Sequence, residues 1–287
     1  MKNAAAKKAN PFAALLGGLK RKGRRAAPDA TPVDGARARF EALALLWGEN
    51  RLRPCAEATD AGLALALAAG PDARLAQFPA GLGASARIIS ERTGASVDGY
   101  DDRPDVLAAM DRKAAPRLDG HLIDLAAPVL AGRDYDGAVG FDLAAAGDDA
   151  SALLKALRDG LKPGAILATH EIVARWANHS ALAPCRRTPW GPRRFVTEDD
   201  AGRALAAAGF ELISSDDATE SLADAISDGF ARLRSAAPDL LESAQKDAFA
   251  RAKLMEIAAS AACWMPAASL LAEGKLFARR LVVRRPA

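Results

Sequence analysis

Residues 74–104 read RLAQFPAGLGASARIISERTGASVDGYDDRP, and this stretch decides the fold class. Its pattern of apolar and polar residues predicts a strand over 74–78 and a second strand over 95–100, with a helix over 83–93 between them. Two glycines lie in the loop that follows the first strand. A strand, a glycine loop, a helix and a second strand in this order are typical of α/β domains that bind a nucleotide.

The alternation of strands and helices continues on both sides of this stretch. Further strands are predicted over 121–125, 135–143, 165–173, 210–216 and 276–286. Further helices are predicted over 36–50, 60–70, 104–112, 149–160 and 197–209, and a long helical insert over 218–272 precedes the last strand. Strands separated by helices form a mostly parallel sheet with helices on both faces. We therefore expect an α/β fold with a doubly wound, seven-stranded sheet.

Residues 1–34 are expected to form a basic flexible tail and linker, followed by a single domain over 35–287. The first 28 residues contain eight Lys and Arg and no acid, whereas the remainder has 31 basic residues against 36 acidic ones. The folded part is therefore mildly acidic, which argues against specific nucleic-acid binding. Two interpretations of the tail stay open, a solvated disordered segment or a weak contact with acidic membrane lipid.

Composition narrows the class of protein further. The 287-residue chain has three widely spaced cysteines, three histidines and no CxxC pair, so we expect no metal site and no disulfide framework. Free cysteines fit a reducing, cytoplasmic location. No apolar run reaches the roughly 18–20 residues that a membrane span needs. The sequence does not indicate an oligomeric state.

A ligand site is expected at the carboxyl ends of the strands, where open α/β sheets bind their ligands. The loop after the first strand places Ala80, Gly81 and Gly83 there, and a glycine backbone can approach a ligand closely because it has no Cβ. Asp101 and Asp102 follow the second strand, at the spacing where an acid holds the hydroxyls of a ribose. A second interpretation stays open, in which the glycines only form a tight turn and the aspartates cap the next helix.

Five segments, two of them from this site, together resemble motifs of the class I S-adenosylmethionine-dependent methyltransferases. The resemblance is strongest to those acting on phosphoethanolamine and other small amines. The segments are PAGLGAS (79–85), GYDD (99–102), YDGAVGFDL (135–143), LRDGLKPGAILATHEIV (157–173) and TEDDAGRALAAAGFELISSDDAT (197–219). The resemblance covers nearly all of the predicted domain. It implies a small-molecule substrate and S-adenosylmethionine as cofactor. The cofactor-binding positions it implies are Gln77, Ala80, Gly81, Gly83, Asp101, Asp102 and Asp124, and Asp136 matches the acid of the fourth-strand motif.

The first motif of that family is degenerate in this chain. Gln77 stands where the family has an acid, and Pro79 stands where it has the first loop glycine. Proline fixes φ and removes an N–H donor. Glutamine can still accept a hydrogen bond from an ammonium, but without a charge. Losing one charge-assisted bond costs roughly 1–3 kcal/mol, so the change weakens cofactor binding without abolishing it.

The candidate catalytic residues are Asp142, His170 and Glu171, in the fourth and fifth predicted strands. Methyl transfer depends mainly on aligning the nucleophile with the methyl group, and an amine acceptor also benefits from a nearby base. His170 is expected at the end of its strand, facing the mouth of the cleft, where its charge could change near neutral pH. The alternative is a histidine in a surface loop.

Outside the motifs, the loop 175–195 is rich in arginine. It predicts a lid with an anion-binding face, for a phosphate or carboxylate, or else a solvated cover loop. Trp47 is expected to pack over the cofactor cleft, and Trp264 is expected in the core.

The sequence thus supports a methyltransferase that acts on a small polar molecule or a lipid head group. Gln77 and Pro79 motivate an alternative, a catalytically inactive protein of the same fold that serves as a binding or regulatory partner. A dehydrogenase is disfavoured because Ala86 stands at the third glycine of GxGxxG and no Tyr-x-x-x-Lys follows. A methyltransferase of nucleic acids would need an Asn/Asp-Pro-Pro-aromatic motif, which the sequence lacks.

Overall fold

The computed structural model describes residues 34–110, 117–146, 150–188 and 191–287. The predicted tail lies outside the described residues apart from Asp34, so its two interpretations stay predictions. The extent of the domain, 35–287, also stays a prediction.

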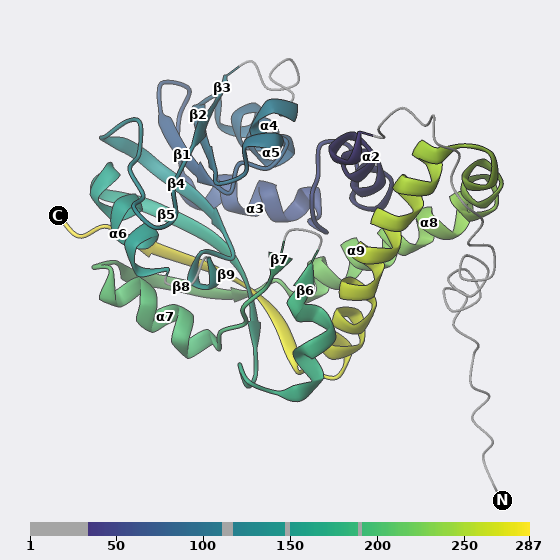
Figure 1. Cartoon of the computed structure of the whole chain (residues 1–287). Coiled ribbons are helices and arrows are strands. Elements are labelled where there is room, and N and C mark those ends of the chain that lie inside the picture. Colours follow the sequence, from purple (N-terminus) through teal and green to yellow (C-terminus); the bar gives the residue numbers. More distant parts are fainter. Residues whose placement is uncertain (1–33, 111–116, 147–149, 189–190) are drawn as a thin grey trace, which may run out of the picture.

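A seven-stranded sheet forms the centre of the molecule, in the order β3-β2-β1-β4-β5-β9-β8 (Figure 1). Its strands are β1 (Arg74–Phe78), β2 (Ser96–Asp101), β3 (Leu118–Leu122), β4 (Tyr135–Phe141), β5 (Leu161–Ala174), β8 (Glu211–Asp217) and β9 (Leu276–Arg284). Neighbouring strands from β3 to β5 run parallel, and β9 runs antiparallel to both β5 and β8. The predicted α/β fold with a mostly parallel, seven-stranded sheet is confirmed.

Helices cover both faces of the sheet because its central strands, such as β1 and β4, are buried on both sides. The helices are α3 (Glu57–Leu67), α4 (Ala84–Thr93), α5 (Pro104–Ala109), α6 (Ser151–Gly160) and α7 (Glu198–Ala207). Side chains of α3, α4 and α5 form one buried cluster with the sheet, and those of α6 and α7 form another. In β4 the neighbouring residues Ala138 and Val139 belong to opposite clusters, as the alternation of a strand requires.

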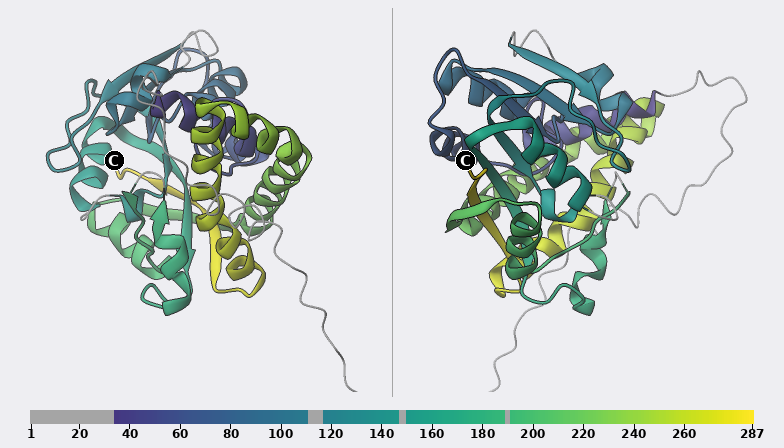
Figure 2. Two further views of the ribbon diagram at one scale, coloured as in Figure 1. Left: turned by 45° about the vertical axis from the view of Figure 1, so that its right-hand side comes forward. Right: turned by 90° about the vertical axis from the view of Figure 1, so that its left-hand side faces the viewer.

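A third group of helices packs beside the sheet and consists of α2 (Gly35–Trp47), α8 (Thr219–Lys246) and α9 (Ala248–Ala272). The three helices lie together in both views of Figure 2. Their buried side chains join those of Ile172, Leu276 and Ala278 at the ends of β5 and β9. Segments from the two ends of the chain therefore close over one side of the sheet.

The predicted helical insert over 218–272 is two helices. The break falls at Asp247, whose backbone is extended and whose carboxylate accepts a hydrogen bond from the Ala250 N–H at 2.6 Å. An aspartate in this position caps a helix start because it satisfies an N–H that has no partner within the helix. The chain therefore reverses there, and α9 packs against α8.

Most strand boundaries differ from the predicted ones by one or two residues, and those of β3 and β5 differ by more. Strand β3 ends at Leu122, where its partner β2 ends, instead of running over 121–125. Strand β5 covers Leu161–Ala174 instead of 165–173, because β4 pairs with it at Leu161 and β9 pairs with it as far as Ala174. Partner strands set these limits, and apolar pattern alone does not show them.

Helix α9 is long and apolar enough to cross a membrane by length and composition, and half of its most apolar window is buried inside the protein. The sequence prediction that no segment could span a membrane therefore overlooked α9. Since α9 packs against α2 and α8, it serves here as a core helix of the third group.

Candidate functional site

A cavity of about 300 Å³ lies at the carboxyl ends of β1, β2 and β4, under the third helix group. This is where open α/β sheets bind ligands, and the volume falls within the usual range for small molecules. One end is lined by Gln77, the loop that follows β1, and Asp102. The other end is lined by Arg53, Asp142, Arg193, Ser260 and Trp264. We call these the loop end and the arginine end.

Glycines shape the loop end. Gly81 and Gly83 have φ of 57° and 94°, values that side chains other than glycine rarely adopt. Two hydrogen bonds hold the loop to β2: Ala80 N–H donates to the Tyr100 carbonyl at 2.7 Å, and Gly81 N–H donates to Asp101 Oδ2 at 3.0 Å. The helix α4 starts directly after the loop, with no side-chain cap at Gly83 among the described residues. Its first N–H groups therefore lie at the cavity wall beside Ser85.

Gln77 is the second-to-last residue of β1, at the loop end, and is almost completely buried. Its Nε2 donates to the carbonyls of Pro79 and Ala80, at 3.2 and 3.3 Å. Its Oε1 is buried and has no hydrogen-bond partner among the described residues. A buried acceptor without a donor costs free energy, so Gln77 Oε1 is a candidate acceptor for a donor group that enters the cavity.

The two neighbouring aspartates have different surroundings. Asp101 is fully buried and binds the Arg103 guanidinium through both oxygens, at 2.7 and 2.8 Å, besides the Gly81 N–H. Its carboxylate is thus occupied in fixing the loop, and Asp101 does not line the cavity. Asp102 does line it. Asp102, and not Asp101, is therefore the aspartate at the cavity wall.

Among the other predicted cofactor positions, Ala80 lines the cavity and Asp124 does not. Asp124 is exposed and accepts a hydrogen bond from the Ala126 N–H at 2.9 Å, while its neighbour Leu125 lines the cavity. Asp136, the acid of the fourth-strand motif, lies at the start of β4, away from the cavity. It accepts hydrogen bonds from Arg74 N–H and Lys162 Nζ.

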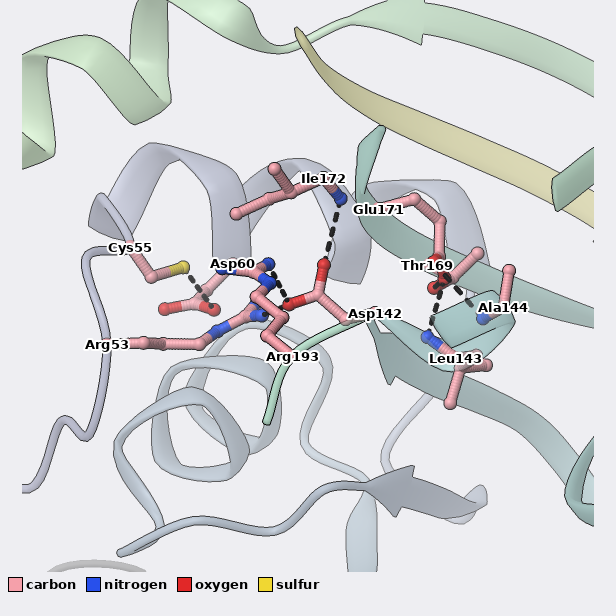
Figure 3. Close-up of polar contacts among 10 residues, drawn as sticks. All are labelled: Arg53, Cys55, Asp60, Asp142, Leu143, Ala144, Thr169, Glu171, Ile172 and Arg193. Atoms are coloured by element: carbon pink, nitrogen blue, oxygen red, sulfur yellow. Dashed lines mark hydrogen bonds and ion pairs between the residues drawn. The ribbon is translucent and has the colours of Figure 1, made fainter. Parts of the chain in front are cut away.

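Asp142 organises the arginine end. It follows β4 with a φ of 53°, a conformation in which aspartate is over-represented among side-chain-bearing residues. Its Oδ1 accepts from the Ile172 N–H at 2.8 Å, and its Oδ2 accepts from Arg53 at 3.0 Å and from Arg193 at 2.7 Å (Figure 3). Burial would raise the pKa of Asp142, but the charges of Arg193 and Arg53 outweigh burial and hold the pKa below its usual value.

Glu171 and His170 lie inside the protein behind Asp142. Glu171 is buried, and it accepts hydrogen bonds from Thr169 Oγ1 at 2.5 Å, from Leu143 N–H at 2.9 Å and from Ala144 N–H at 3.2 Å (Figure 3). It thereby caps the 3₁₀ turn η1 (Leu143–Ala145). Burial, and next the charge of Asp142, raise the pKa of Glu171 to about 7.

The expected placement of His170 at the cleft mouth is wrong. His170 is 1% exposed and lies within β5, which continues four residues beyond it because β9 pairs with that part of the strand. Burial, and next the charge of Arg53, lower the pKa of His170 to about 3. The side chain is therefore neutral near pH 7, and it does not line the cavity.

Four residues of the arginine end were not singled out from the sequence as site residues: Arg53, Arg193, Ser260 and Trp264. Arg193 belongs to the basic loop 175–195, which holds η2 (Ser180–Arg186), β6 (Arg187–Thr188) and β7 (Gly191–Pro192) and reaches the cavity. Trp264 is buried and also lines the cavity, so its expected core position was incomplete. Trp47 packs edge-on against Trp264 with ring centroids 6.0 Å apart, behind the cavity wall.

Other ligand classes find less support in the described residues. Among them, no three His, Cys, Asp or Glu side chains gather in a way that could hold a metal ion. Cys55, Cys185 and Cys263 are all buried free thiols.

No protein-family model matches the chain, and neither does any curated protein sequence. Solved structures do match. A phosphoethanolamine N-methyltransferase 2 from Haemonchus contortus, solved with S-adenosylhomocysteine, superposes with a TM-score of 0.70 at 15% identity, over 86% of this chain. A SAM-dependent methyltransferase from Thiobacillus denitrificans, also solved with S-adenosylhomocysteine, has a TM-score of 0.60 at 16% identity, over 85% of this chain and 97% of its own.

The chain has the fold of the class I S-adenosylmethionine-dependent methyltransferases. It spans 57% of the length of the Haemonchus contortus methyltransferase. The same fold also occurs in the [4+2]-cyclase SpnF, which matches with a TM-score of 0.59 at 19% identity, over 92% of this chain and 100% of its own. The methyltransferase fold therefore carries more than one chemistry, and function has to be argued from the cavity.

Proposed function

We propose that this protein is an S-adenosylmethionine-dependent methyltransferase that acts on a small polar molecule. The observation that carries the proposal is the unpaired Oε1 of Gln77, a buried acceptor at the cavity wall beside the glycine loop. An ammonium group is a donor of the right chemistry for it, and a charged donor strengthens the bond. The fold and the position of the cavity at the strand ends support the same assignment.

Each polar group of the cofactor has a possible binding partner at the loop end. Its ammonium would bind Gln77 Oε1, and its carboxylate would bind the free N–H groups at the start of α4, where the helix dipole favours an anion. Its ribose hydroxyls would bind Asp102, and Leu125 offers an apolar surface for the base. When bound, the cofactor supplies a methyl group on a positively charged sulfur.

The protein would promote methyl transfer by positioning the acceptor. Asp142 is a weak base because two guanidiniums share its charge, and Glu171 and His170 are enclosed behind it. No side chain among these three is both basic and open to the cavity. The arginine end therefore holds and orients the acceptor against the methyl group, and alignment accounts for much of the rate enhancement in such a displacement.

Titration calorimetry with S-adenosylhomocysteine tests this function. We expect a dissociation constant on the order of 1–10 μM for the wild type. Asp102→Ala should weaken binding about tenfold, as the loss of a charged acceptor does. Asp124→Ala is the matched control, because Asp124 is exposed outside the cavity, and it should leave binding unchanged. Absence of heat at about 1 mM ligand would refute the proposal.

One observation favours a second function, a protein of this fold that binds the cofactor without transferring its methyl group. The neutral Gln77 stands where the resembled family has an acid, and its amide is committed to the loop carbonyls. In that case S-adenosylhomocysteine binds, but methyl-labelled S-adenosylmethionine transfers no label to small amines, alcohols, carboxylates or phosphate esters. Transfer to any of these would remove the alternative.

A further inference from the structure

Two polar groups at the arginine end have unused hydrogen-bonding capacity. Arg53 Nη2 and Ser260 Oγ are both enclosed by protein, and neither has a hydrogen-bond partner among the described residues. Both residues line the cavity. Ser260 is 1% exposed, so bulk water does not satisfy its hydroxyl. Buried polar groups are nearly always paired, which suggests that a ligand pairs these two.

The arginine end also carries more positive than negative charge. Four arginines of the described part of the chain line the cavity, and of these Arg51 has Asp60 at 2.6 Å and Arg103 has Asp101 at 2.7 Å. Arg53 and Arg193 share a single oxygen of Asp142.

Two further titratable groups lie behind this pair. His170 is neutral near pH 7 since burial lowers its pKa to about 3, and Glu171, whose pKa burial raises to about 7, is only partly ionised there. The negative charge beside the two guanidiniums therefore does not balance their two positive charges.

Aromatic rings pack against both guanidiniums. Arg53 lies 4.1 Å above the ring of Phe141, and Arg193 lies 5.3 Å from the ring of Trp264. Their side chains are only 22% and 13% exposed, so solvent screens them weakly. Ser260 lies one helical turn before Trp264 on α9, and residues with this spacing share one face of a helix. The cations and the hydroxyl thus border one part of the cavity.

We propose that Arg53, Arg193 and Ser260 form a subsite for an anionic group of the methyl acceptor, a carboxylate or a phosphate ester. This inference rests on the proposed function, because it names the class of acceptor for the same cavity. Guanidiniums match the geometry of carboxylate and phosphate oxygens, and the hydroxyl supplies a further donor. Asp142 acts as a positioning group that holds the two arginines together.

Nuclear magnetic resonance of two small anions tests the subsite without cofactor. Trifluoroacetate, followed by its fluorine signal, stands for a carboxylate, and inorganic phosphate, followed by its phosphorus signal, stands for a phosphate ester. We expect saturable line broadening by the wild-type protein for at least one probe. Arg53→Gln and Arg193→Gln should each weaken that binding about fivefold or more, and Ser260→Ala about threefold.

Arg37→Gln is the matched control, because Arg37 is an exposed arginine paired with Glu41 on α2. It should bind the probes as the wild type does. The proposal is overturned if the wild type shows no saturable broadening, or if all variants bind equally. Should an arginine variant fail to fold, Ser260→Ala decides, since it removes a single oxygen.

Cofactor titration separates this inference from the function on which it rests. S-adenosylhomocysteine binding without anion binding overturns the subsite and leaves the proposed function standing. Anion binding that depends on Arg53 and Arg193, without any binding of S-adenosylhomocysteine, keeps the anion site and overturns the proposed function.

Discussion

The two ends of the cavity are built in different ways. The loop end comes from one continuous stretch that runs from Gln77 to Ser85, in which Gly83 itself does not line the cavity, and from the residues just after β2. The arginine end comes from four distant segments, which bring Arg53, Asp142, Arg193 and Ser260 together. Local geometry determines the first end and tertiary packing the second.

The largest expected effect distinguishes the two neighbouring aspartates of the loop end. Asp101→Ala should lower the free energy of unfolding by about 3 kcal/mol, because it leaves Arg103 and the Gly81 N–H without their buried partner. Asp102→Ala should change it by less than about 0.5 kcal/mol, since Asp102 is 41% exposed. Urea unfolding of both variants measures the difference. Equal losses would show that the two aspartates are not divided into a structural and a ligand-facing role.

A smaller effect is expected at the turn behind the arginine end. Glu171→Gln should destabilise the protein by about 2 kcal/mol, because an amide nitrogen would face an N–H of Leu143 or Ala144 that now donates to a carboxylate. Thermal unfolding monitored by circular dichroism gives the value. Glu198→Gln, a change at a 40% exposed carboxylate on α7, is the control and should be nearly neutral. A neutral Glu171→Gln would contradict the assigned capping role.

The pH dependence of stability should reveal the buried pair in β5. The folded pKa of His170, about 3, lies below its ordinary 6.5, so the unfolded state binds more protons between these values and stability falls as the pH drops. The folded pKa of Glu171, about 7, lies above its ordinary 4.5, so between these values stability falls as the pH rises. The two effects oppose each other between pH 4.5 and 6.5.

His170→Phe removes one of these effects. The variant should gain stability relative to the wild type as the pH falls from 6.5 toward 3, and it should lose stability as the pH rises from 4.5 toward 7. Chemical unfolding at several pH values measures the difference between the two proteins. A difference that does not change with pH would mean that His170 is not held neutral in the folded state.

The contrast between the two ends also explains what could be predicted from the sequence. Strand and helix periodicity, together with the glycines after β1, predicted the sheet and the position of the cavity, because these signals are local. Asp101 and Asp102 could not be told apart, since only the hydrogen bonds of the folded loop show which one faces the ligand. His170 was misplaced because pairing with β9 extends β5 beyond it. Arg53 and Ser260 belong to no motif, and packing alone brings them to the cavity.

The central claim is that Gln77 Oε1 receives the ammonium of the cofactor. Equilibrium titration of S-adenosylmethionine into Gln77→Met and Gln77→Glu tests it most directly. Both variants lose the donor to the Pro79 and Ala80 carbonyls. Gln77→Glu also places a carboxylate oxygen against these carbonyls, so the loop is disturbed at least as much as in Gln77→Met, and tighter binding by Gln77→Glu reports the acceptor. We predict that Gln77→Glu binds at least about tenfold more tightly than Gln77→Met, the gain of one charge-assisted hydrogen bond. Equal dissociation constants for the two folded variants would contradict the account.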